Sequence, residues 1–100
     1  MQNDALIAAL SDEWNASGFF GRLRVGHFDP AGARRVKQLL LAIPSEGADL
    51  PRRLVALTWS IPAFMGWQRD AVTQAGGSLR ELETAAATFQ SLLEQAFGVP

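Results

Sequence analysis

Apolar residues recur three or four positions apart along most of this chain, which is the spacing of one face of an α-helix. The first stretch with this spacing contains Leu6, Ile7, Leu10 and Trp14. Asn3 or Asp4 can cap its start, because a short polar side chain can accept hydrogen bonds from the free amides of the first turn. We therefore expect a first helix that ends near Ser17-Gly18 and places Trp14 in the core.

Two further helical segments follow, and Gly26 separates them. Residues 19–25 are few and contain two phenylalanines, so we expect one or two helical turns there, with a strand as the less favoured alternative. Asp29-Pro30 then predicts the start of a longer helix, because aspartate can cap it and proline has no amide hydrogen to lose at the first helical position. This helix is expected to reach about Ile43, where a Pro-Ser-Glu-Gly sequence stops it. Its apolar stripe consists of Ala33, Val36, Leu39, Leu40 and Ile43.

The run from Leu54 to Trp67 is crowded with apolar and aromatic residues, and Pro62 divides it. A helix is expected to begin at residues 49–51 and to lead into this run. Proline in a helix interior costs about 3 kcal/mol, so we expect Ser60 to cap a new helix with Pro62 in its first turn. A kinked continuous helix is the alternative. The stripe of the new helix consists of Ile61, Phe64, Met65, Gln68, Ala71, Val72 and Ala75.

The end of the chain predicts one long helix. Gly76-Gly77 closes the preceding helix, since glycine readily adopts a left-handed backbone. Residues 78–81, Ser-Leu-Arg-Glu, then match a capping box, in which the serine and glutamate side chains each accept a hydrogen bond from a free amide. This last helix is expected to reach Phe97, and its small residues Ala85–Ala87 would let a neighbouring helix approach closely. Its apolar seam consists of Leu79, Leu82, Ala86, Phe89, Leu93, Ala96 and Phe97.

These patterns predict an all-α fold, because no stretch alternates apolar and polar residues for long enough to indicate a sheet. We expect residues 1–100 to form a single domain, a compact bundle of about five helices. Apolar residues make up 48% of the chain and charged residues 19%, as in globular proteins. The run Leu54–Gln68 is shorter than the ~20 apolar residues that cross a bilayer, so no membrane contact is expected. The N-terminus carries Asp4 where a signal peptide would carry Lys or Arg, which indicates a cytoplasmic location.

Residue types suited to catalysis or metal binding are scarce. The absence of cysteine excludes disulfides, thiolate metal sites and thiol nucleophiles. His27 is the sole histidine, and because its neighbour Asp29 is explained as a helix cap, we expect His27 to be structural or solvated. Asp12 and Glu13 point about 100° apart on a helix and are interpreted as a solvated face. No catalytic residue, metal ligand or cofactor is predicted, and the chain is not expected to be an enzyme.

The net charge is only −1, but the two signs are unevenly distributed. Residues 22–53 contain seven basic and three acidic side chains, whereas the rest of the chain contains two basic and seven acidic ones. Helix surfaces can produce such asymmetry without a functional cause, and this is the preferred interpretation. The alternative is an electrostatic field that attracts a partner.

The basic residues could instead line a nucleic-acid-binding face, with Arg34, Arg35 and Lys37 of one helix contacting phosphates. The acidic isoelectric point argues against this, as does the shortage of side chains that read bases on that helix. A DNA-binding regulator is therefore the least favoured function. The basic residues of the middle segment are Arg22, Arg24, Arg34, Arg35, Lys37, Arg52 and Arg53.

A protein-binding role is favoured after this elimination. In size, composition and style, the whole chain resembles the small bacterial immunity proteins of interbacterial toxin systems, including those of contact-dependent growth inhibition. The resemblance implies tight stoichiometric binding that covers the active site of a cognate toxin, often a nuclease whose basic surface is steered by acidic groups. Immunity proteins share no common motif, so the resemblance identifies no binding residue.

Candidate partner-binding residues come from the chain's own chemistry. Trp67 and Arg69 are candidates because these residue types concentrate binding energy at interfaces. For Trp67 the preferred interpretation is nevertheless a half-buried position at the edge of the core. An alternative function is a homodimeric scaffold or accessory subunit that pairs through the Ile61–Trp67 face. The acidic candidates are Asp70, Glu81, Glu83 and Glu94.

Overall fold

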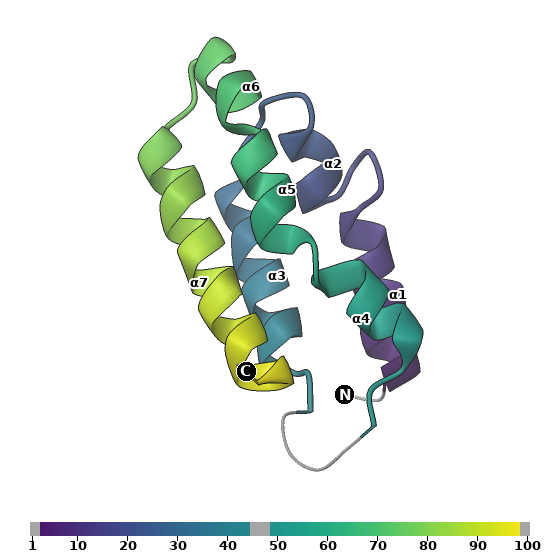
Figure 1. The fold of residues 1–100 in the computed structure, drawn as a ribbon. Coiled ribbons are helices and arrows are strands. Elements are labelled where there is room, and N and C mark those ends of the chain that lie inside the picture. Colours follow the sequence, from purple (N-terminus) through teal and green to yellow (C-terminus); the bar gives the residue numbers. More distant parts are fainter. Residues whose placement is uncertain (1–2, 45–48, 99–100) are drawn as a thin grey trace.

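The computed structural model describes residues 3–44 and 49–98, and within these ranges it contains helices and no strands (Figure 1). The all-α fold class is confirmed. The Cα radius of gyration is 13.3 Å, close to the ~13 Å of a compact chain of this length. None of the helices in these two ranges is long and apolar enough to span a bilayer. The helices are α1 (Asn3–Glu13), α2 (Phe19–Leu23), α3 (Pro30–Leu41), α4 (Arg52–Thr58), α5 (Ile61–Trp67), α6 (Arg69–Gln74) and α7 (Leu79–Phe97).

The longest helix, α7, packs against α3 on one side and α5 on the other, and α1 packs against α3 and α4 (Figure 1). The core between them is rich in phenylalanine. Phe19 and Phe20 are fully buried, and the ring of Phe19 meets the edge of Phe89 from α7 at a centroid distance of 5.9 Å. Trp14 stacks on Phe20 at 4.2 Å and donates a hydrogen bond from its indole nitrogen to the Leu57 carbonyl, which confirms its expected place against the core.

The turn between α1 and α2 is tighter than the sequence predicted. Helix α1 ends at Glu13, not near Ser17-Gly18. The chain folds back at once so that the first two residues of α2 enter the core, and glycines permit the close approach. A Cβ atom on Gly18 would lie 2.4 Å from the Asp12 carbonyl oxygen, and one on Gly21 would lie 1.9 Å from that of Asn15.

Helix α3 begins at Pro30, as expected, and its stripe of apolar residues faces the core. It ends at Leu41, close to the predicted end at Ile43. Of the predicted stop sequence, residues 45–47 lie outside the described residues. The predicted role of Asp29 was wrong: it occupies the N-cap position, but within residues 3–44 its carboxylate makes no capping hydrogen bond. It lies instead beside two arginines.

The predicted break at Ser60 and Pro62 is confirmed. Helix α4 ends at Thr58, α5 begins at Ile61, and Pro62 lies in the first turn, where its missing amide hydrogen has no helical partner. The Ser60 hydroxyl makes no capping hydrogen bond in the described part of the chain. Its carbonyl accepts from the Phe64 amide at 2.8 Å, so the serine contributes through its backbone.

A second break, at Gln68, was not predicted. We expected one helix to Gly76-Gly77, but α5 ends at Trp67 and a separate α6 follows. The Gln68 side-chain amide donates to the Phe64 carbonyl at 3.3 Å, and the Gln68 backbone amide bonds to the Met65 carbonyl instead. The side chain thus occupies the acceptor that would have continued the helix.

The ends of α7 follow the sequence signals. The Ser78 hydroxyl accepts a hydrogen bond from the Glu81 amide at 3.2 Å, which confirms the serine half of the capping box. The helix ends at Phe97, before Gly98 with φ of 84°. Its small residues face both neighbouring helices, because Ala85 lines a hollow beside α3 and Ala86 lines one beside α5.

Candidate functional site

Two large aromatic side chains stand out on the surface beside α5. Trp59 is 69% exposed and Trp67 is 74% exposed. The preferred prediction for Trp67, a half-buried position at the edge of the core, was wrong. Trp67 is the last residue of α5 and follows Gly66, which is itself exposed, so no neighbouring side chain covers it from that position.

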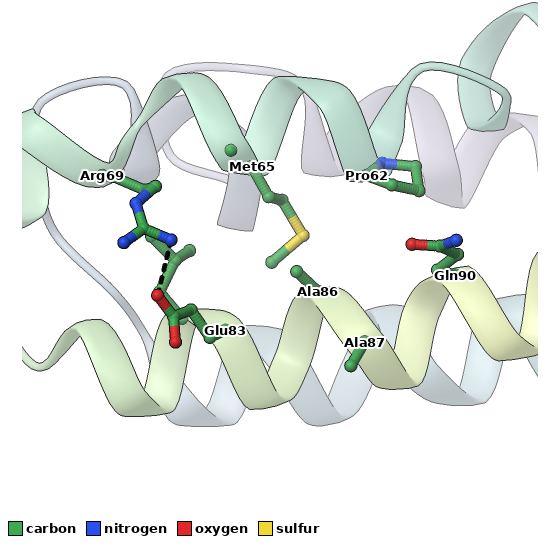
Figure 2. Close-up of a pocket in the computed structure, with 9 residues that line it drawn as sticks. Pro62, Met65, Arg69, Glu83, Ala86, Ala87 and Gln90 are labelled. Atoms are coloured by element: carbon green, nitrogen blue, oxygen red, sulfur yellow. Dashed lines mark ion pairs between the residues drawn. The ribbon is translucent and has the colours of Figure 1, made fainter.

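A hollow of about 260 Å³ lies between α5 and α7, and Gly66, the residue before Trp67, lines it. Its floor is apolar, with Met65 and Leu82 buried in the core, and Figure 2 shows the Met65 side chain directed at Ala86 of α7. An ion pair between Arg69 and Glu83 crosses one end of this hollow (Figure 2). Both side chains of the pair are 53% exposed, so water screens their attraction.

A second hollow of about 390 Å³ continues along the same seam, since Pro62 and Gln90 line both. Phe97 is 36% exposed and lies at this hollow together with Trp59. Glu94 also lines it and accepts a hydrogen bond from the Gln90 side-chain amide at 3.2 Å. The result is an apolar groove with an aromatic and acidic edge.

Trp67 belongs to the same surface because it follows Ala63 by one helical turn of α5, and Ala63 lines the second hollow. Trp59 lies before the break at Ser60 and lines the second hollow itself. We call this surface the aromatic face. It consists of Trp59, Ala63, Trp67, Gln90, Glu94 and Phe97.

The predicted partner-binding residues divide between two sides of α7. Glu94 lies on the aromatic face, whereas Glu83 lines the first hollow and is paired with Arg69. Asp70 is exposed on the short helix α6. Glu81 lies apart from them, in a hollow between α7 and α3. Because Arg69 pairs with Glu83, it is already engaged by a carboxylate of its own chain.

Trp59 and Phe97 were missing from the predicted site. Phe97 was assigned to the apolar seam of the last helix, but its position at the end of α7 leaves it partly exposed. A signal for Trp59 was present, since Trp59, Ala63 and Trp67 are spaced by four and so fall outside the stripe that contains Ile61 and Met65.

The interpretation of Glu13 as part of a solvated face was wrong, because its side chain is only 8% exposed. Glu13 accepts hydrogen bonds from Arg35 Nε at 2.9 Å and Nη2 at 3.1 Å, and from the Phe19 amide at 3.0 Å. Burial alone would raise the pKa of Glu13, but these hydrogen bonds and the charge of Arg35 outweigh it, so the pKa lies below the ordinary 4.5. This cluster fastens the turn after α1 to α3 and is structural.

Several arginines of the basic middle segment interact with other residues of the chain itself. Arg35 pairs with Glu13, and Arg22 lies 3.6 Å from the Asp29 carboxylate. Arg24 lies over the rings of Trp14 and Phe64, at 5.7 and 5.5 Å from their centroids. Three of the seven predicted nucleic-acid-binding residues thus serve the chain's own structure.

Other chemistry is sparse in the described residues. His27 is exposed in the loop before α3. Among residues 3–44 and 49–98, no three His, Cys, Asp or Glu side chains are grouped so that they could hold a metal ion. Comparison of the chain with protein-family models, curated proteins and solved structures gives no match.

Proposed function

We propose that this chain is an immunity protein that binds a cognate interbacterial toxin domain and neutralises it by covering the toxin's active site. The observation that carries the proposal is the aromatic face, where Trp59 lines an apolar groove and both Trp59 and Trp67 are more than two-thirds exposed. Exposed tryptophans are typical of protein interfaces, because tryptophan contributes large contact area and a polar nitrogen. The choice of toxin as partner rests on the chain's resemblance to immunity proteins.

The charge near the aromatic face favours a basic partner surface. Glu94 lines the groove, and Asp70 and Glu83 lie on the helices that border it. Nuclease active sites are surrounded by cations that bind phosphate, so a nuclease is the first class of toxin to test. A cation of the partner can also replace Arg69 as the ion-pair partner of Glu83 at little cost, because that pair is exposed to water.

Growth protection tests the proposal. The proposal predicts that a toxin gene lies beside the gene for this chain. Cells that express the toxin domain of that gene should grow when the wild-type chain is co-expressed, and should stop growing with the Trp59→Ala/Trp67→Ala variant. The matched control is Val25→Ala/Leu41→Ala, which removes two other exposed apolar side chains and should protect fully. Failure of the wild-type chain to protect against the adjacent toxin would refute the proposal.

A homodimeric scaffold is the second candidate, and the same exposed tryptophans favour it. The Ile61–Trp67 face cannot pair as first expected, because Ile61, Phe64 and Met65 are buried in the chain's own core. A dimer would have to use Trp59, Trp67 and the groove beside them. Sedimentation velocity separates the two candidates: a monomer whose sedimentation coefficient does not change with concentration excludes the dimer and leaves the aromatic face free for another protein.

A further inference from the structure

A second groove runs along the other side of α7, where it packs against α3. Three hollows of about 360, 140 and 70 Å³ follow each other along this seam. They pair successive turns of α3 with successive turns of α7, from Pro30 beside Thr84 to Leu41 beside Leu92. The two helices therefore run side by side in the same direction, as Figure 1 shows. Helix α3 has 12 residues, so the groove is roughly 18 Å long.

The part of this groove that begins near Pro30 is basic. Arg34 and Lys37 of α3 and Arg80 of α7 line it, and Glu81 is the one acidic residue among the lining residues of the first two hollows. Within residues 3–44 and 49–98 none of these four side chains takes part in an ion pair. The exposed cations of Arg34, Lys37 and Arg80 are thus available to an outside group, in contrast to those of Arg22 and Arg35.

The floor of the groove is apolar or small, and its far end is apolar. Phe28, Ala33 and Ala85 form the floor beneath the cations. Leu41 is 52% exposed at the opposite end, beside Leu92. An occupant would therefore need acidic side chains toward one end and an aliphatic side chain toward the other.

We infer that the α3–α7 groove is a docking site for an acidic amphipathic helix of a protein partner. A helix in a groove presents apolar side chains at spacings of three and four to the floor, and its flanking residues face the edges. Here the floor and Leu41 receive the apolar side chains, and the three cations receive Glu or Asp side chains. This site is separate from the aromatic face, which lies across α7 from it, and does not depend on the toxin-binding role.

The same cations fit a protein segment better than a nucleic acid. A phosphate backbone would use several closely set cations and would gain little from an exposed leucine. The groove offers only three cations. It also contains the acidic Glu81 and has an apolar far end. Duplex DNA is accordingly the competing ligand to exclude by experiment.

A peptide titration of the full chain tests the inference. The probe is a synthetic amphipathic helix of Glu and Leu, with Leu at every third or fourth position, and its control has Lys in place of every Glu. Amide resonances of Ala33, Ala85 and Leu41 should shift with the Glu peptide and not with the Lys peptide. The variant Arg34→Glu/Lys37→Glu should weaken binding about tenfold or more, because two attractive contacts become repulsive.

The matched control is Arg52→Glu/Arg53→Glu, which makes the same change of charge at two exposed positions of α4. It should retain most of the affinity for the Glu peptide. Three results would overturn the inference: no shift at the groove residues, equal weakening by the two double variants, or duplex DNA that shifts the same amides with higher affinity than the Glu peptide. Circular dichroism of both variants should match that of the wild type, since all four positions are exposed.

Discussion

At the residue scale, Glu13 explains how a polar group can hold this small core together. Its carboxylate is buried but receives hydrogen bonds from Arg35 and the Phe19 amide, so it stays charged at neutral pH. Arg35 remains half exposed, which leaves its other donors to water. Removing one partner of a buried pair costs more than the pair contributes, since the remaining group loses its hydrogen bonds.

Glu13→Gln should lower the free energy of unfolding by about 2 kcal/mol at neutral pH, because hydrogen bonds to a charged group are lost. The folded-state pKa of Glu13 lies below its unfolded value, so its contribution is present above about pH 4.5 and is lost as the pH falls through the folded-state pKa. Urea unfolding at several pH values should therefore show a smaller acid destabilisation in this variant than in the wild type.

The companion variant Arg35→Gln leaves Glu13 buried without its cation. Burial then raises the pKa of Glu13, so the acid dependence of stability from this group should flatten or change sign. An acid dependence of Glu13→Gln as steep as that of the wild type would show that this pair does not control it.

Gly26 is a second residue on which the packing depends. It has φ of 86°, and a Cβ atom there would lie 2.3 Å from the Ala71 carbonyl oxygen of α6. Gly76 has a similar φ of 81°, but no atom beyond its chain neighbours lies within 4 Å of its Cβ position. Alanine substitutions at the two glycines can therefore separate the cost of a strained backbone from the cost of a steric clash.

Gly76→Ala should cost about 1–2 kcal/mol, the price of a left-handed backbone for alanine. Gly26→Ala should cost clearly more, because α6 must also move away from the turn after α2. Equal losses of stability in urea unfolding would mean that the close approach of Gly26 to α6 does not matter.

At the element scale, the local chemistry of the chain determines where helices begin and end. Pro30, Pro62, Ser78 and Gly98 mark boundaries close to those predicted, because each acts through its own backbone or its nearest neighbours. Gln68 shows the limit of such reasoning. Its side chain competes with its own backbone amide, and no apolar pattern reports that competition.

Gly66 lowers the stability of α5, although the packing around α5 does not require a glycine at this position. It lies inside the helix, and apart from its chain neighbours and the nearby backbone of its own helix, no atom lies within 4 Å of its Cβ position. Gly66→Ala should therefore raise the free energy of unfolding by roughly 0.5–1 kcal/mol. A loss of stability in urea unfolding would contradict the open space seen beside α5.

At the scale of the whole molecule, the sequence predicts the fold class better than the candidate site. The apolar stripes name most of the buried residues, since helical periodicity follows directly from burial of one face. Glu13 and Trp67 were misplaced because their surroundings come from distant parts of the chain or from a helix end. Which side of α7 carries Glu81 and which carries Glu83 also depends on the packing of α3 and α5.

The fold also explains why the uneven charge of the sequence does not appear as one basic and one acidic surface. Arg22 and Arg35 are paired within the chain, whereas Arg34, Lys37 and Arg80 meet along one side of α7. The aromatic face, with Glu94, lies on the other side. Helix α7 thus separates two surfaces that differ in charge and in shape.

Calorimetric titration of the wild-type chain with the toxin domain that the proposal expects beside its gene tests the central claim most directly. We expect one-to-one binding with a nanomolar Kd, and a loss of at least about 100-fold in the Trp59→Ala/Trp67→Ala variant, because each tryptophan at an interface hot spot contributes about 2 kcal/mol or more. The Val25→Ala/Leu41→Ala control should bind as the wild type does. Absence of binding by the wild-type chain, or undiminished binding by the double tryptophan variant, would contradict the claim that the aromatic face is the toxin-binding surface.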